Sequence, residues 1–314
     1  MTYPLVRFLN ICRDRVLEFN PWTNVYGLAR TLLAVGTGAT LLCSRSTALF
    51  RPAWGVTEVP VCQGISRVGL FCILPQHLEI ARWIAVVVLL VVASGWYPRI
   101  TASLHWWVSF SLATSAVMID GGDQVSQVLT LFLLPIALTD SRMWHWQHSD
   151  NRSACWKRLV ALSAVVALRI QVAGIYLHAA IGKLGVQEWR DGTALYYWFI
   201  HPAFGAPRPV WYLLLPLLRH GLTLTLMTWS AIILELFLFT ALVMPKRAWV
   251  YFLVAGLIFH AGIALIHGLM SFSIAMAAAL VLYLRPIDKS FILPSFAHAK
   301  EDSMLVSTEP YRSL

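Results

Sequence analysis

Apolar residues occur along the chain in repeated blocks, separated by short polar stretches. Most blocks have a length of about 17 to 25 residues, which one α-helix needs to cross about 30 Å of hydrocarbon. A transmembrane β-barrel would show shorter segments of alternating polarity instead. The pattern predicts an all-α polytopic integral membrane protein with eight transmembrane helices, at residues 24–43, 78–96, 101–119, 124–139, 158–183, 221–243, 247–266 and 269–285.

The composition indicates the same class of protein. Of the 314 residues, 58% are hydrophobic and only 12% are charged, and the mean hydropathy is +0.67. These values exclude an ordinary water-soluble domain. The net charge of +9 is also found in nucleic-acid-binding proteins, but here the basic residues lie in short loops beside apolar blocks. Orientation in a membrane explains them better, and we expect no nucleic acid as a partner.

The basic residues also predict how the chain is oriented, because cytoplasmic loops are enriched in Lys and Arg. With the N-terminus inside, every inner loop is basic, through Arg99, Arg142, Arg152, Lys157, Arg158, Lys246, Arg247, Arg285 and Lys289. The outer side then receives residues 44–77, 120–123 and 184–220. We therefore expect a multi-pass protein with both termini in the cytoplasm.

Two terminal segments fall outside the predicted membrane domain of residues 20–285. Residues 1–19 have apolar positions at helical spacing with arginines between them, which indicates an amphipathic helix in the inner interface. This segment lacks the continuous apolar core and cleavage site of a signal peptide. Residues 286–314 are polar and without periodicity, so they are expected to form a disordered cytoplasmic tail.

Two cysteines share the first predicted outer loop. Cys62 and Cys72 fall outside, whereas Cys12 and Cys155 fall inside. Disulfides form and persist in oxidising compartments, so this placement predicts a bond between Cys62 and Cys72. The alternative is that both are unpaired small hydrophobic residues in a re-entrant apolar stretch.

Arg30, Arg169 and Glu235 are charged residues well inside predicted spans, where each must face the bundle interior and find a partner. Arg169 and Glu235 are each fourteen residues below the predicted outer ends of their helices, a depth of roughly 21 Å. They are therefore predicted to form a structural ion pair, with Arg30 as an alternative partner for Glu235. A structural role is favoured over a catalytic one.

The fifth span carries Arg169, Tyr176 and Lys183 at seven-residue intervals, which places them on one inward face. A lysine at a helix end often extends toward lipid headgroups, and spacing alone does not distinguish this role from a functional one. If Tyr176, Trp189 and Tyr196 surround it instead, Lys183 becomes a candidate base.

The seventh span carries a second seven-residue pair, His260 and His267, in its outer half. Such a pair can relay protons or bind a metal, but no further ligand lies at a suitable spacing, so we favour hydrogen bonding and expect no metal. Asp123 belongs to a tight turn on the same predicted side, where it is a helix cap or a member of the site.

The outer segment 189–199 is rich in aromatic residues but too short and too polar to span a membrane. It is predicted to lie in the outer interface and to cover the site. Its candidate substrate-binding residues are Trp189, Asp191, Tyr196 and Tyr197. The alternative is a simple aromatic membrane anchor.

Several motifs in this order resemble the sporulation-delaying protein B family over roughly residues 20–285. They are Asn20 to Arg30, the Cys62 to Cys72 loop, Gly121-Gly122-Asp123-Gln124, Tyr176 to Leu184, Trp189 to Trp198, and Phe259 to Phe272. The resemblance implies the transmembrane (HTTM) fold shared with vitamin K-dependent gamma-carboxylase. It also implies a bacterial cell membrane protein that matures a secreted antimicrobial peptide toxin together with a small SdpA-like partner protein.

The resemblance also implies roles for individual residues. Lys183 matches the lysine that acts as the base of the carboxylase, and His260 matches a histidine in a later membrane helix. However, Gly182 stands where the carboxylase has a second lysine, and the large lumenal domain is missing. Carboxylation with vitamin K is therefore not expected, and no cofactor is identified.

The expected function is maturation of a toxin precursor at the outer face, with Lys183 as candidate base and His260, His267, Tyr176 and Asp123 in support. Whether the protein is an enzyme, and for which reaction, is left open. A second reading makes the polar interior an export path for the peptide. A third makes the protein a non-catalytic scaffold for its partner and a protease.

Overall fold

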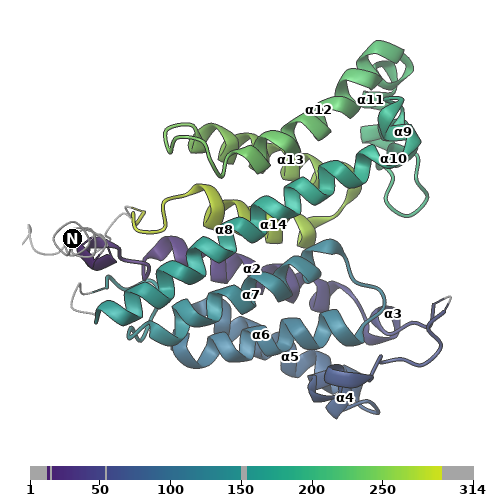
Figure 1. The fold of residues 1–314 in the computed structure, drawn as a ribbon. Helices are drawn as coiled ribbons and strands as arrows, with labels where there is room; N and C mark the ends of the chain where they lie inside the picture. Colours follow the sequence, from purple (N-terminus) through teal and green to yellow (C-terminus); the bar gives the residue numbers. More distant parts are fainter. Residues whose placement is uncertain (1–12, 15, 54, 150–153, 292–314) are drawn as a thin grey trace, which may run out of the picture.

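The structure is a computed structural model that describes residues 13–14, 16–53, 55–149 and 154–291 (Figure 1). Within these residues the chain is all-helical and has no β-strand. The predicted N-terminal amphipathic helix and the predicted disordered tail fall almost entirely outside the described residues. Both remain predictions.

Each of the eight predicted spans coincides with a long helix. These are α2 (Asn24–Cys43), α5 (Leu78–Ser94), α6 (Pro98–Ser115), α7 (Gly121–Thr139), α8 (Cys155–Leu184), α12 (Gly221–Thr240), α13 (Trp249–His267) and α14 (Met270–Leu284). By length and composition, five of the described helices can cross a membrane: α2, α7, α8, α12 and α13. The other three are shorter or, in α6, more polar. The count of eight spans therefore stays a prediction.

Short helices fill the connections on the predicted outer side. Between α2 and α5 lie α3 (Ser46–Leu49), η1 (Gly64–Val68) and α4 (Leu70–Ile73). Between α8 and α12 lie α9 (Gln187–Arg190), α10 (Ala194–Phe199) and α11 (Arg208–Arg219). The sulfur atoms of Cys62 and Cys72 are bonded in the first of these connections, which confirms the predicted disulfide.

Helix ends follow from local chemistry. The Asp120 carboxylate accepts hydrogen bonds from the backbone N–H groups of Gly122 and Asp123, so α7 begins directly after it. Gly95 ends α5 and Gly268 ends α13, both with a positive φ that residues with a Cβ rarely adopt.

The helices form layers around α14, which packs against α2, α7, α8 and α13 (Figure 1). The largest apolar core runs through α2, α7, α8 and α14. A second core joins α2, α5 and α6, and α12 and α13 lie on the far side of α8 and α14 (Figure 1). This arrangement leaves room between α7, α8, α12 and α13.

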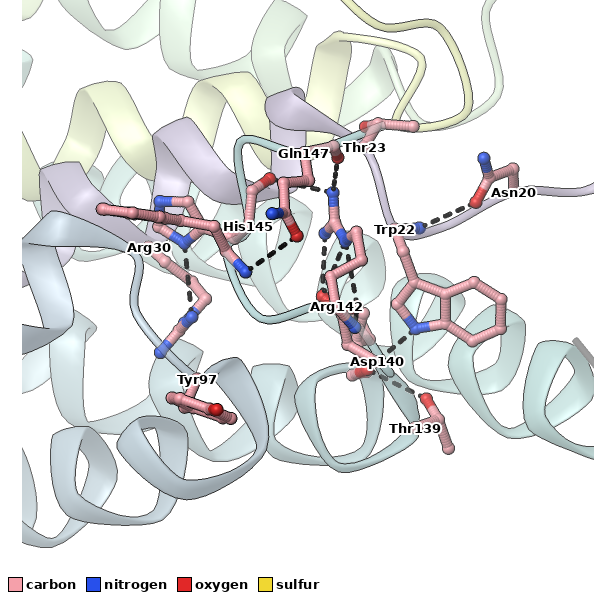
Figure 2. Close-up of polar contacts among 12 residues, drawn as sticks. Asn20, Trp22, Thr23, Arg30, Tyr97, Thr139, Asp140, Arg142, His145 and Gln147 are labelled. Carbon is pink, nitrogen blue, oxygen red and sulfur yellow. Dashed lines mark hydrogen bonds and ion pairs between the residues drawn. The ribbon is translucent and has the colours of Figure 1, made fainter. Parts of the chain in front are cut away.

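The loop between α7 and α8 is held by a buried ion pair (Figure 2). The Arg142 guanidinium lies 2.7 Å from the Asp140 carboxylate and also donates to the backbone carbonyls of His145 and Gln147. Figure 2 shows Arg30 of α2 reaching the His145 ring from the other side. Because these groups are buried, their bonds are stronger than at a surface, and they hold the loop against α2.

Candidate functional site

A cavity of about 840 Å³ lies between α7, α8, α12, α13 and α14. The short helices α9 and α10 contribute Trp189, Leu195 and Trp198 to its wall. The lining is mainly apolar, with a few polar side chains from separate helices. Cavities of this size and character are typical of binding sites for small molecules or peptide segments.

An ion pair lies in this cavity. Lys183 Nζ, at the end of α8, is 2.6 Å from Glu235 Oε1 of α12, and the two side chains are 22% and 6% exposed. The Lys183 ammonium also lies 5.3 Å from the centre of the Trp189 ring. Lys183 is therefore directed inward, as the functional reading required, and does not extend toward lipid headgroups.

The predicted partners of Glu235 were wrong. An Arg169–Glu235 pair requires the outer ends of α8 and α12 to lie at the same level. Instead, α12 extends much further at that end. Glu235 is fourteen residues into α12, about 21 Å from its start, yet meets the last turn of α8. It is therefore out of reach for Arg169.

The two rejected arginines have other partners. Arg169 lies 4.8 Å from the centre of the Trp249 ring, a cation–π contact. Arg30 donates to Thr101 Oγ1 at 2.9 Å and contacts His145 Nδ1 at 3.3 Å. Neither forms an ion pair with Glu235 in the described part of the chain.

A second polar pair lines the cavity. The Tyr176 hydroxyl of α8 and His260 Nε2 of α13 are 3.1 Å apart, and both residues are buried. The Ser273 hydroxyl donates to the backbone carbonyl of His260, which ties α14 to this part of α13. The structure thus brings together three of the predicted site residues, Lys183, Tyr176 and His260.

His267 lines the outer part of the same cavity. Its Nδ1 lies 2.7 Å from the carbonyl oxygen of Phe204, so this nitrogen carries a proton and donates it, and the ring stacks on Phe199. Among the described residues, no three His, Cys, Asp or Glu side chains come together as a metal site requires. The roles of both histidines remain predictions.

Asp123 does not line the cavity, so its predicted place in the site is wrong. Its neighbours Gly121 and Gln124 face the cavity, and one step along a helix turns the side chain by about 100°. The Asp123 carboxylate is 2% exposed and lies near Thr37 and Thr40 of α2 instead.

The predicted covering segment supplies different side chains from those expected. Trp189 lines the cavity, but Asp191, Tyr196 and Tyr197 are exposed and do not. Their proposed contact with substrate is not supported. Gly192 packs tightly on α12, since a Cβ at this position would lie 2.6 Å from Thr225. The close approach fixes this segment to α12.

Three further polar residues of the cavity wall were not among the predicted site residues: Gln124, Gln171 and His178. Gln171 and His178 stand seven residues apart on α8, with Gly174 between them on the same face. This spacing was a usable signal, because polar residues in an apolar span must face an interior or a cavity.

The arrangement is suited to proton transfer in an apolar environment. Lys183 and Glu235 hold an exchangeable proton between an amine and a carboxylate, and Tyr176 and His260 form a second such pair. Tyr176, His260 and Glu235 are buried and the Lys183 side chain is 22% exposed, so their surroundings strengthen the interaction with any charge on a bound substrate.

Comparison with known proteins gives two close relatives, both from Bacillus subtilis (strain 168). Uncharacterized protein YitO is 40% identical over 280 residues, which cover 87% of this chain and 89% of YitO. Sporulation-delaying protein SdpB is 35% identical over 292 residues, which cover 92% of this chain and 89% of SdpB. No family model and no solved structure matches. The chain therefore belongs to the sporulation-delaying protein B family.

Proposed function

We propose that this protein is a multi-pass membrane factor that matures a secreted, SDP-like antimicrobial peptide. A segment of the peptide precursor occupies the cavity, where Lys183 and Glu235 transfer protons and Tyr176 and His260 assist. We take eight spans with both termini inside, an orientation in which the cavity would open at the outer face. A small SdpA-like protein acts as partner, and no cofactor is assigned.

The observation that carries the proposal is the Lys183–Glu235 ion pair inside an apolar cavity. An ion pair taken out of water loses much of its solvation, and replacing it by apolar residues is often neutral or stabilising. A purely structural need therefore explains it poorly. Family membership supplies the process, because the SdpB relative is named for a sporulation-delaying activity.

Glu235, the partner of Lys183, extends the assignment of this lysine as a base. A base alone requires only an amine in an apolar wall, whereas here a carboxylate lies 2.6 Å away. We therefore assign the proton transfer to the pair. Lys183 donates to or accepts from the substrate, and Glu235 holds the proton in the other half of the step.

The test is mass spectrometry of the secreted peptide from cells that contain the precursor and partner genes. Lys183→Ala and Glu235→Gln should abolish the mature peptide, while Lys183→Arg keeps the charge but not the proton exchange and should also fail. Lys246→Ala, an exposed lysine between α12 and α13, is the matched control. Protein levels in the membrane are measured for each variant.

Other outcomes identify the alternative functions. Mature peptide trapped inside Lys183→Ala cells would indicate an export path. Normal peptide from all variants would indicate a scaffold and contradict the proposal.

A further inference from the structure

A second set of polar side chains is buried between α2, α6 and α7, apart from the cavity. None of its members lines the cavity, and His105, Ser109 and Ser126 each have a side-chain polar atom with no hydrogen-bond partner among the described residues. The Asp123 carboxylate lies near Thr37 and Thr40, and the Tyr26 hydroxyl lies near Arg30. All but Thr40 are 2% exposed or less. The set consists of Tyr26, Thr37, Thr40, His105, Ser109, Asp123 and Ser126.

These side chains lie at different heights along the three helices, and we refer to the whole set as the file. Counted from the predicted inner ends at 1.5 Å per residue, His105 lies at a height of roughly 10 Å and Ser109 at roughly 16 Å. Thr37 and Ser126 both lie at roughly 20 Å, and Asp123 at roughly 24 Å. From His105 to Asp123 the polar groups therefore cover heights from roughly 10 Å to roughly 24 Å, with Tyr26 lower on α2 at roughly 3 Å.

Contacts between the helices support these relative heights, which the helix lengths alone would not establish. At the upper end, Asp123 of α7 lies near Thr37 and Thr40 of α2. At the lower end, Arg30 of α2 donates to Thr101 of α6, one turn from His105. α7 also packs against both α2 and α6.

The two ends of the file differ in charge. Asp123 and its neighbour Asp120, which accepts from Ser271 at 2.5 Å, make the predicted outer end acidic. Arg30, 1% exposed, makes the inner end basic, and behind it lie His145 and the Asp140–Arg142 pair (Figure 2). A fixed positive charge in such a path repels protons and other cations.

Unpartnered polar groups in a membrane interior cost several kcal/mol each unless water satisfies them. A row of hydroxyls, an imidazole and a carboxylate offers each water the two to four polar partners that a buried water needs. We propose that water molecules fill this file and carry protons between Asp123 and the inner end, with Arg30 as the barrier that keeps the path closed. Each water molecule accepts a proton from one neighbour and releases a proton to the next. Asp123 gains a proton from the outer side and passes it to the first water molecule.

The hydration of the file is tested on the wild-type protein by radiolytic hydroxyl labelling in detergent, read by mass spectrometry. Tyr26 and Tyr283 are a matched pair, since both are 0% exposed but only the Tyr283 hydroxyl donates to backbone carbonyls, those of Leu238 and Phe239, whereas the Tyr26 hydroxyl lies near Arg30. We expect oxidation of Tyr26 and His105 and little of Tyr283. If Tyr26 is protected as fully as Tyr283, the file is dry and the proposal is wrong.

Proton conduction is tested in liposomes that contain a pH-sensitive dye. The wild type should conduct little, and Arg30→Gln should raise proton flux by about tenfold or more, since removing a barrier of ~1.4 kcal/mol changes a rate tenfold. Adding Asp123→Asn should return the flux to the wild-type level. A folded Arg30→Gln protein without increased flux, or flux that persists with Asp123→Asn, would contradict the path. Labelled Tyr26 without flux would show that the water is structural only.

Discussion

The two polar regions of this protein bury their polar side chains in different ways. In the cavity between α8, α12 and α13, polar groups meet in pairs, Lys183 with Glu235 and Tyr176 with His260, although Glu235 Oε2 and His260 Nδ1 have no further partner among the described residues. In the file between α2, α6 and α7, the side-chain polar atoms of His105, Ser109 and Ser126 have no protein partner in the described structure. Paired groups are suited to a fixed geometry around a substrate, whereas unpaired groups are suited to water. Of the two regions, the cavity therefore fits better the peptide-binding role that we propose.

The largest expected effect comes from breaking the ion pair. Glu235→Ala leaves the Lys183 ammonium, whose side chain is 22% exposed, without its carboxylate partner and should destabilise the protein by about 3 kcal/mol, measured by thermal unfolding in detergent. The double variant Lys183→Met/Glu235→Leu should regain much of this stability without regaining mature peptide. A double variant that still produces peptide would show that the pair is structural.

The next effect is steric and concerns the inner end of the file. A Cβ on Gly95 would lie 2.4 Å from the His145 ring, and the φ of Gly95 is +87°. Gly95→Ala should therefore lower the free energy of unfolding by about 2 kcal/mol. Gly262→Ala on α13, where a Cβ meets nothing within 4 Å, is the matched control and should be neutral or slightly stabilising.

A third prediction concerns pH. Burial, together with the charges of Arg30 and Arg142, lowers the pKa of His145 from 6.5 to about 2, so the folded protein holds it neutral. Below pH 6.5 the unfolded chain binds a proton that the folded one does not, so stability falls with decreasing pH until about pH 2. The contribution is up to about 1.4 kcal/mol per pH unit.

His145→Asn isolates this contribution, because its amide oxygen can accept from Arg30 but does not titrate in this range. Unfolding temperatures measured between pH 7 and pH 5 should fall less steeply in this variant than in the wild type. Equal slopes in the two proteins would contradict the assignment to His145.

The smallest expected effect sharpens the description of the cavity. Tyr176→Phe removes the hydroxyl that bonds His260 at 3.1 Å and should cost about 1 kcal/mol of stability, measured by thermal unfolding. Tyr197→Phe, an exposed tyrosine outside the cavity, should change stability by less than about 0.5 kcal/mol. Secreted peptide should decrease only in the first variant.

Local sequence patterns predicted the helices well and their mutual heights poorly. Apolar block lengths located all eight long helices, and seven-residue spacing placed Tyr176 and Lys183 on one inward face. The partner of Glu235 was missed because the relative height of two helices depends on packing between them, not on their own sequences. Asp123 and Tyr197 were misplaced for a similar reason, since a turn composition does not specify which neighbour a side chain meets.

The close packing of Gly192 against Thr225 has a mechanical consequence. Since α12 carries both this contact and Glu235, a tilt of α12 would shift the cover of the cavity and stretch the bond to Lys183 in one movement. Entry of a substrate and release of the lysine from its carboxylate are then a single event. The Lys183 amine would then be free to react only while the covering segment is displaced from the cavity.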